Sequence, residues 1–326
     1  MDFNGTKQAT LAELLALHLR TNILAQPTKD RYDLVARNLS RFMGGTTAQP
    51  SDVCLEKITS EVMLGFRTWS LQRMKPVSFN TERRHLSVLF NAGVEARLMA
   101  ENPTRRVPAA PVLQAAPKAL SKAAIGMYMD WLRTTSLPDA SGRPIDVIQP
   151  QWFWYAVLRT FYFTGMRKRQ LIGLVWDDID FEARTILLAA RTSKTGREWN
   201  VPLPEPLRAD LENLRDRTRA VCKAALGPRQ VFCLPLFHER PSSFRHTSMT
   251  ADNLDNFFQK LRRAMPADAP RLSAHRIRHT TCTILANKVR NLKVVQQQLG
   301  HSSITTTYQY VHPDMDAMRQ ALKGLA

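Results

Sequence analysis

The chain has 326 residues, and its 44% hydrophobic and 23% charged content is typical of globular proteins, so we expect two domains. Lys and Arg number 46 against 28 Asp and Glu, a formal net charge of +18 at pH 7. No apolar run reaches the roughly 18 residues that cross a membrane, and the first ten residues lack the pattern of a secretory signal. The positive charge extends over both halves of the chain, which favours a nucleic-acid partner over a ribosome-associated or merely basic protein.

Cysteine usage indicates the compartment. Cys54, Cys222, Cys233 and Cys282 are scattered without a C-x-x-C pair. This spacing favours reduced thiols over a disulfide framework. We therefore expect a cytoplasmic protein with no membrane contact.

Residues 1–106 are predicted to form a helical domain. Apolar periodicity predicts helices over residues 11–20 and 28–43, a third after Thr59, and a fourth over about 80–98. Thr28 is the expected cap of the second helix, and Gly44 with the next glycine ends it. The fourth helix begins with basic residues, of which Arg83 and Arg84 are candidate DNA contacts.

Residues 107–120 are rich in proline and alanine, and we expect them to be a linker. Residues 121–326 then form a mostly helical second domain. Its first strong apolar helix ends at Gly165, and a new helix begins near Arg167. Residues 185–188 and 198–203 read as two strands around a turn at Lys194, Thr195 and Gly196, with Arg197 beside it as a further candidate DNA contact. Helical patterns resume at residues 207, 253 and 275.

A cluster of reactive side chains lies in residues 275–282. His275, Arg278, His279 and Cys282 fall at helical spacing. A zinc site is one interpretation, but Arg278 would project beside the ion. A helix whose histidines cap or pack is the structural alternative. The third interpretation is an anion site, because an arginine offers a planar fork to two phosphate oxygens.

Three motifs occur in chain order: TGMRKRQLIGLVWDDID at residues 164–180, HRIRHT at 275–280 and LGHSSITTTYQYVH at 299–312. In content and spacing they resemble the tyrosine recombinase family, the phage-integrase-type site-specific recombinases. The resemblance covers about residues 119–326. The helical module before it is similar to the family's core-binding domain in length, helix count and placement.

The resemblance implies a role for each motif residue. Tyr310 would be the nucleophile, and Arg167 and Arg278 would clamp the scissile phosphate. His275 would assist proton transfer, and His301 would hydrogen-bond the phosphate. Lys194, from the hairpin turn, would protonate the leaving 5′-oxygen. Tyr308 is expected to pack or to make a local hydrogen bond.

Elementary chemistry agrees with this set of residues. Fixed guanidinium groups and imidazoles can stabilise the charge of a phosphodiester transition state without a metal. The energy of the broken bond is kept in a phosphotyrosine ester, and the sequence contains neither a G-x-x-x-x-G-K-[ST] loop nor a cluster of acidic residues for Mg²⁺. We therefore expect no cofactor and no metal.

The resemblance implies a mainly α fold: a helical, SAM-like core-binding domain and a mostly α catalytic domain with a small β-hairpin or sheet, together forming a C-shaped clamp on DNA. The expected activity is that of a tyrosine-type DNA strand transferase, for integration or excision of a mobile element or for resolution of cointegrates or replicon dimers. A DNA-binding relative without catalysis and a topoisomerase-like relaxing enzyme are the alternatives.

The expected partners are double-stranded DNA with inverted-repeat core sites and three further copies of the chain, as a homotetramer on two duplexes. A second recombinase subunit or an accessory protein could join them, and the expected place is the bacterial nucleoid. Residues 315–325 have the apolar spacing of an amphipathic helix, which the resemblance assigns to a neighbouring subunit.

Two residues depart from the family pattern. Gln170 stands where Glu is common, which is expected to change a buried support for Arg167. Arg276 stands where Asp is frequent. The turn before the third motif also lacks the usual Gly-Asp-Ile-like sequence. These departures indicate a divergent branch of the family.

Overall fold

A computed structural model describes residues 8–112, 119–138, 144–193, 196–223, 225–237, 247–289, 291–308, 310, 319 and 322. The chain divides into two compact units, Met1–Ala115 and Ala116–Ala326. Each unit has its own apolar core. None of the described helices is both long and apolar enough to cross a membrane.

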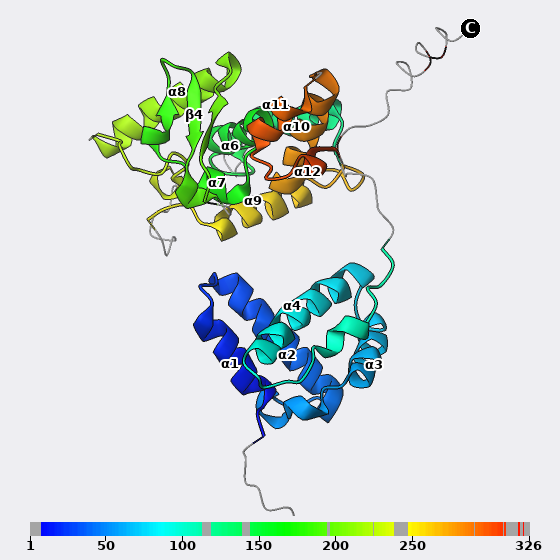
Figure 1. The fold of residues 1–326 in the computed structure, drawn as a ribbon. Helices are drawn as coiled ribbons and strands as arrows, with labels where there is room; N and C mark the ends of the chain where they lie inside the picture. The colour runs from blue at the N-terminus through cyan, green and yellow to red at the C-terminus, as the bar shows by residue number, and fades with distance from the viewer. Residues whose placement is uncertain are drawn as a thin grey trace, which may run out of the picture. The chain divides into compact units, whose positions relative to one another are not determined.

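The first unit is a bundle of α-helices (Figure 1). These are α1 (Leu11–Thr21), α2 (Gln26–Gly44), α3 (Ser60–Leu71) and α4 (Pro76–Glu95). Their apolar faces meet in one core, in which Phe66 and Phe90 are fully buried. The four helices expected here are present, and α4 begins four residues earlier than expected because Pro76 can occupy the first turn of a helix.

The expected cap at Thr28 is wrong. Helix α2 begins at Gln26 with Ala25 as its N-cap, because Pro27 lacks an N–H and is suited to the first helical turn. At the predicted linker, Val107 and Ala110 are buried in the core of the first unit.

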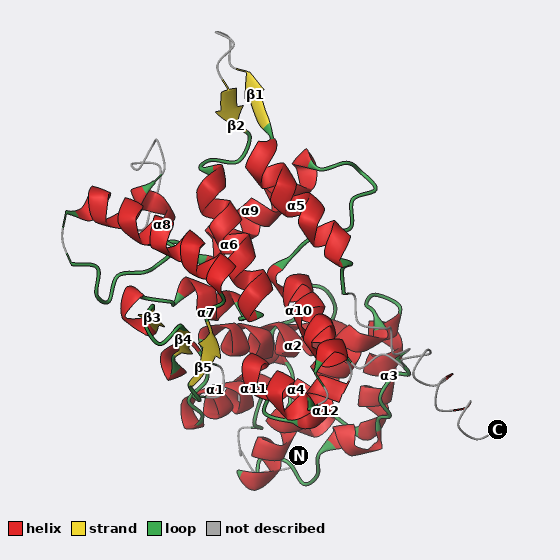
Figure 2. Cartoon of the chain, turned by 90° about the horizontal axis from the view of Figure 1, so that it is seen from above, coloured by secondary structure: helices red, strands yellow, loops and turns green. Residues whose placement is uncertain are grey.

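The second unit is also mainly helical, with a small three-stranded sheet and a separate pair of strands (Figure 2). Helix α6 lies at its centre and contacts α5, α8 and α10. The helices are α5 (Lys122–Thr134), α6 (Gln151–Thr164), α7 (Lys168–Ile172), α8 (Glu205–Cys222), α9 (Ala251–Ala264), α10 (Ala274–Lys288), α11 (Leu292–Leu299) and α12 (Ile304–Tyr308).

The sheet has three antiparallel strands in the order β3-β4-β5. They are β3 (Ile179–Asp180), β4 (Thr185–Leu188) and β5 (Trp199–Pro202). The predicted pair of strands is confirmed, with Leu188 opposite Trp199 in the register. Strand β3 was not predicted, and neither was a separate antiparallel pair of β1 (Ser136–Pro138) with β2 (Pro144–Asp146).

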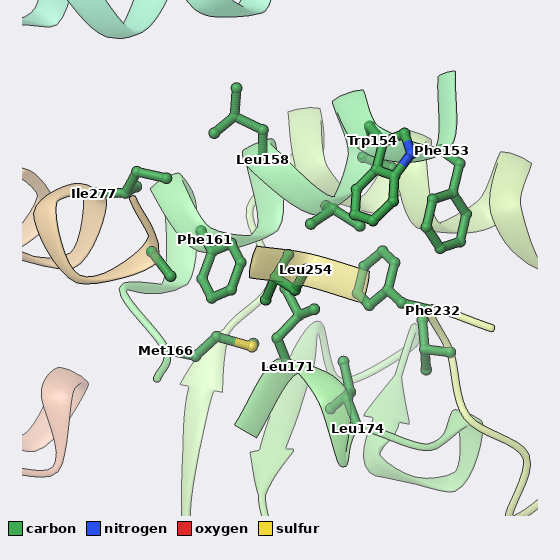
Figure 3. Packing of buried hydrophobic residues seen from close by; sticks show 14 of the residues in the cluster. Phe153, Trp154, Leu158, Phe161, Met166, Leu171, Leu174, Phe232, Leu254 and Ile277 are labelled. Atoms are coloured by element: carbon green, nitrogen blue, oxygen red, sulfur yellow. The ribbon is translucent and has the colours of Figure 1, made fainter. Parts of the chain in front are cut away.

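Aromatic and aliphatic side chains from separate elements form the core of the second unit (Figure 3). Phe161 of α6, Leu171 of α7, Leu254 of α9 and Ile277 of α10 are fully buried in it. This packing fixes the ends of α6 and α10, where the candidate site residues lie. Of the predicted tail helix, only Leu322 and residue 319 are described, and Leu322 is exposed.

Gly165 is required by both backbone and packing. It ends α6 with φ +64°, and a Cβ atom there would lie 2.6 Å from Leu299 Cδ2. We expect Gly165→Ala to lower the free energy of unfolding by roughly 2 kcal/mol, because the left-handed conformation and the contact with Leu299 both oppose a side chain. Urea unfolding followed by circular dichroism measures this.

Gly126 is the matched control. It lies inside α5, and nothing lies within 4 Å of the position of its Cβ atom. Gly126→Ala is expected to raise the free energy of unfolding by about 0.5–1 kcal/mol through helix propensity. An equal loss of stability in both variants would contradict the explanation for Gly165.

Candidate active site

Arg278 lies on α10 and joins the ends of two other helices. Its Nη1 donates to the carbonyl of Gly165 at 2.7 Å, and its Nη2 donates to the carbonyl of Leu299 at 2.7 Å. Gly165 ends α6 and Leu299 is the last residue of α11. The C-terminal ends of helices carry partial negative charge, so these carbonyls stabilise a buried guanidinium. Only 7% of Arg278 is exposed.

Arg167 lies at the junction between α6 and α7. Its Nη2 is 3.5 Å from the carbonyl oxygen of Gly300. Its backbone N–H donates to Oε1 of the buried Gln170 at 2.8 Å. Gln170 therefore supports the backbone of Arg167, while its Nε2 has no hydrogen-bond partner in the described part of the chain.

The turn after α11 is fixed by a tryptophan from the sheet. Gly300 has φ +61°, and a Cβ atom there would lie 2.2 Å from the ring of Trp199. The indole Nε1 of Trp199 donates to the carbonyl of Gln298 at 3.2 Å. A residue with a side chain would fit here neither sterically nor in its backbone conformation.

His301 follows this turn directly. Its Nδ1 lies 3.0 Å from Oγ1 of the buried Thr307. Its backbone N–H donates to the carbonyl of Gln296, whose side-chain Nε2 donates back to the carbonyl of His301. These contacts hold the imidazole in one orientation on a short connection between α11 and α12.

Tyr310 and the two histidines of α10 form a group of rings. The Nε2 atoms of His275 and His279 lie 2.7 Å apart. The ring of His279 is 5.0 Å from that of Tyr310, and the ring of His301 is 6.2 Å from it on a nearly parallel plane. Tyr310 is 8% exposed, whereas Tyr308 is 59% exposed. Of the two alternatives for Tyr308, packing is therefore wrong, and a local hydrogen bond stays a prediction.

Burial and positive charge keep the histidines neutral. Burial lowers the pKa of His301 to about 4, and Arg278, Arg167 and His279 add to the decrease. The pKa of His279 is also lowered to about 4, by burial and then by His275 and the neighbouring arginines. Each neutral ring has one donor and one acceptor nitrogen.

The two other groups respond to the same surroundings. Burial lowers the pKa of Arg278 to about 10, and the charge of Arg167 contributes to the decrease. Burial raises the pKa of Tyr310, and Cys282 adds to this, whereas Arg278 opposes it. The site thus has two cationic groups beside a protonated phenol at neutral pH.

The remaining predicted site residues lie elsewhere or are not described. Lys194 lies outside the described residues. Arg197 and Arg84 are exposed, while Arg83 is half-buried and its Nε donates to the carbonyl of Val107 at 2.6 Å. Part of the hydrogen-bonding capacity of Arg83 is therefore used inside its own unit.

The structure adds residues that the sequence analysis left without a role. His279 lies between His275 and Tyr310, and its i, i+4 spacing from His275 was the available signal. Cys282 is buried against Tyr310 in a small apolar cluster with Val295 and Leu299. No signal in the sequence indicated the contact between Trp199 and the turn.

The zinc interpretation of this helix finds no support in the geometry. The nitrogens of His275 and His279 form a hydrogen bond with each other, and Cys282 is enclosed in the apolar cluster. Within the described ranges, no three His, Cys, Asp or Glu side chains are grouped as metal ligands.

Known proteins resemble the chain in sequence and in fold. A Pseudomonas syringae protein provisionally named tyrosine recombinase XerC is 29% identical over 319 residues, which are 97% of this chain and 64% of that protein. The Tn1549 transposon integrase, solved in complex with transposon right end DNA, has a TM-score of 0.73 at 19% identity, covering 97% of this chain and 99% of that one.

A lambda integrase tetramer bound to a Holliday junction has a TM-score of 0.67 at 18% identity, covering 94% of this chain and 78% of that one. At these identities the two solved structures show a shared fold. The mainly helical fold predicted from the sequence is confirmed. Residues 149–317 match the family model described as the phage integrase family. Because this match spans more than half of the sequence, the chain belongs to the phage integrase family.

Proposed function

We propose that the protein is a site-specific DNA strand transferase that cleaves and rejoins DNA through a covalent bond to Tyr310. The observation that carries the proposal is the convergence of four separate segments. Arg167 follows α6, Arg278 lies on α10, His301 follows α11, and Tyr310 follows α12. Such a grouping of cations, neutral imidazoles and a phenol suits a phosphodiester.

The reaction would begin with attack of the Tyr310 oxygen on phosphorus. The bond between phosphorus and the 5′-oxygen breaks, which leaves a 3′-phosphotyrosyl ester and a 5′-hydroxyl. The phenol loses its proton, and the leaving 5′-oxygen gains one. Attack by a 5′-hydroxyl of another strand reverses these steps and releases Tyr310, so rejoining consumes no nucleotide.

Arg167 and Arg278 would stabilise the non-bridging oxygens. Each guanidinium group directs some of its N–H groups at backbone carbonyl oxygens. The described partners of both groups include no carboxylate. An arginine has five N–H donors, so each retains donors for a phosphate. Fixed donors of this kind act most strongly on the charge that develops in the transition state.

The histidines would accept the proton of the Tyr310 phenol and hydrogen-bond the phosphate. A phenol has a pKa of about 10, and burial raises that of Tyr310, so attack needs a proton acceptor nearby. Neutral His275 or His279 can accept this proton, and His301 can donate a hydrogen bond to the phosphate. The family resemblance assigns protonation of the 5′-oxygen to Lys194.

The proposed substrate is double-stranded DNA with inverted-repeat core sites, bound by a homotetramer on two duplexes. The charge of +18 and the exposed Arg84 and Arg197 support DNA binding, with Arg83 as a further contact. The lambda integrase tetramer on a Holliday junction supports the assembly. We place the activity at bacterial DNA in the cytoplasm, in integration, excision or resolution of replicons.

Covalent capture tests the proposal. Wild-type protein and Tyr310→Phe are expressed in a bacterium that carries a candidate mobile element, and DNA linked to denatured protein is sequenced. We expect wild type to form adducts at one short inverted-repeat site and Tyr310→Phe to form none while binding DNA normally. Relaxation of arbitrary plasmids without a preferred site would instead indicate a topoisomerase.

Tyr308→Phe is the matched control, because it removes the same hydroxyl from an exposed ring two residues away. We expect its adduct yield to equal that of wild type. Adducts that persist in Tyr310→Phe but disappear in Tyr308→Phe would overturn the choice of nucleophile.

Arg278→Ala is expected to lower the cleavage rate by about 10²- to 10³-fold, with a smaller change in DNA affinity. It also leaves two buried carbonyls unpaired, which costs roughly 1–3 kcal/mol each. Single-turnover cleavage on the captured site and urea unfolding measure the two effects.

Arg159→Ala serves as the control for charge and stability. Arg159 lies on α6 in an ion pair with Asp210, so its loss removes the same charge and destabilises the fold. Its cleavage rate should remain near that of wild type. A comparable rate loss in both variants would argue against a direct role for Arg278.

Neutral histidines also predict a dependence of stability on pH. His279 and His301 have a pKa of about 4 in the folded protein against about 6.5 unfolded, so the unfolded chain binds more protons between these values. The free energy of unfolding should therefore fall as the pH decreases from 6.5 towards 5. The double variant His279→Gln, His301→Gln should lose less stability over this interval in urea unfolding. If the free energy of unfolding of the double variant depended on pH as that of wild type does, the result would contradict the burial assigned to His279 and His301.

A further inference from the structure

Three consecutive backbone carbonyl groups at the end of α11 each face an N–H group of a different side chain. The carbonyl of Gln298 accepts from Trp199 Nε1 at 3.2 Å, and that of Leu299 accepts from Arg278 Nη2 at 2.7 Å. The carbonyl of Gly300 lies 3.5 Å from Arg167 Nη2. One short turn is therefore shared by both arginines of the candidate site and by one tryptophan of the sheet.

Trp199 belongs to the small sheet. It begins β5, pairs with Leu188 of β4, and precedes the fully buried Val201 by two residues. Its ring lies against Gly300, where a Cβ atom would be 2.2 Å away. The indole of Trp199 thus occupies the space that a side chain at position 300 would need.

We propose that Trp199 is a positioning residue for the two arginines. It fixes the carbonyls of residues 298–300, and these carbonyls fix the guanidinium groups of Arg278 and Arg167. The inference rests on the proposed function, since it assigns to Trp199 a role in the strand-transfer reaction. Trp199 acts only through the turn.

Apart from the hydrogen bonds of Trp199 and the two arginines, the other described hydrogen bonds of the turn reach α6 or stay within the turn's own segment. Gln298 Nε2 donates to the carbonyl of Thr164, which ties the turn to α6. Gln296 Nε2 donates to the carbonyl of His301 within the same segment. Gly300 has no side chain to resist a change of φ, so removal of the ring frees the backbone between the two arginines.

A displaced arginine has a specific chemical consequence. Arg167 and Arg278 would act on the negative charge of the non-bridging oxygens. Loss of Trp199 should therefore affect neutralisation of this charge and leave protonation of the leaving 5′-oxygen intact. Two altered substrates separate these effects, both built on the duplex identified by covalent capture.

In the first substrate a methyl group replaces one non-bridging oxygen of the scissile phosphate, which removes the charge that the arginines stabilise. In the second, sulfur replaces the bridging 5′-oxygen and leaves as a thiolate that needs no proton. Single-turnover formation of the tyrosine adduct is measured for wild type, Trp199→Ala and Trp199→Phe on both and on the normal duplex.

We expect Trp199→Ala to lower the rate on the normal duplex by about 10- to 100-fold, since small misplacements of catalytic groups have effects of this size. Trp199→Phe retains a ring but loses the N–H, and should fall between wild type and alanine. On the methyl substrate the deficit of Trp199→Ala should shrink to about threefold or less. On the sulfur substrate it should persist.

Rescue by sulfur and not by methyl would overturn the proposal, because Trp199 would then act on the leaving group. An unchanged deficit on both substrates would overturn it too, as would wild-type rates in both variants. If Trp199→Ala does not fold, Trp199→Phe alone gives the same comparison. Absence of any adduct from wild type would instead refute the proposed function.

Two controls accompany the series. Arg278→Ala should also recover on the methyl substrate, which shows that this substrate reports on the arginines. Trp152→Ala removes an indole of the same unit that packs on Phe237 and Arg217. It should match wild type on all three duplexes.

Discussion

The contact of Arg278 with two helix ends is the constraint on which the site depends. A buried guanidinium is costly unless its donors are paired, and here carbonyls of Gly165 and Leu299 pair with it. Both helices must therefore end at defined residues. Gly165 and Gly300 make this possible, because both adopt positive φ, and neither position has room for a Cβ atom. The glycines that end α6 and α11 thus also bring the carbonyls to the arginine.

Among the described residues, no acidic side chain pairs with the positive charge of the site. Arg167 helps burial to lower the pKa of Arg278, and both arginines help burial to lower the pKa of His301. A carboxylate beside them would stabilise the free protein but would compete with a phosphate. Carbonyl oxygens orient the guanidinium groups with only partial charge. Binding of an anion with several oxygens would therefore stabilise the positive charge of the two arginines.

Local patterns predicted much of the fold, since the helix end at Gly165 and the pairing of β4 with β5 are visible in nearby residues. The misses arise where neighbours compete or where distant segments decide. Pro27 moved the start of α2 away from Thr28. The two-residue strand β3 is too short for a periodic signal, and it exists because β4 lies beside it. The motifs indicated which side chains converge, but the carbonyls that hold Arg278 are 113 and 21 residues away from it in sequence. Contacts between residues this far apart in sequence cannot be predicted from local spacing.

Neutral histidines lie beside the buried Tyr310. A phenol enclosed by Val295, Leu299 and Cys282 keeps its proton at neutral pH, because burial raises its pKa. An arriving phosphate adds negative charge and disfavours a phenolate further. In the proposed reaction, the proton would therefore leave during attack and not before it. A protonated imidazole could not accept it, whereas a histidine kept neutral by burial and by the arginines can. In the proposed reaction, the arginines that would bind the phosphate would thus also keep a proton acceptor available beside Tyr310.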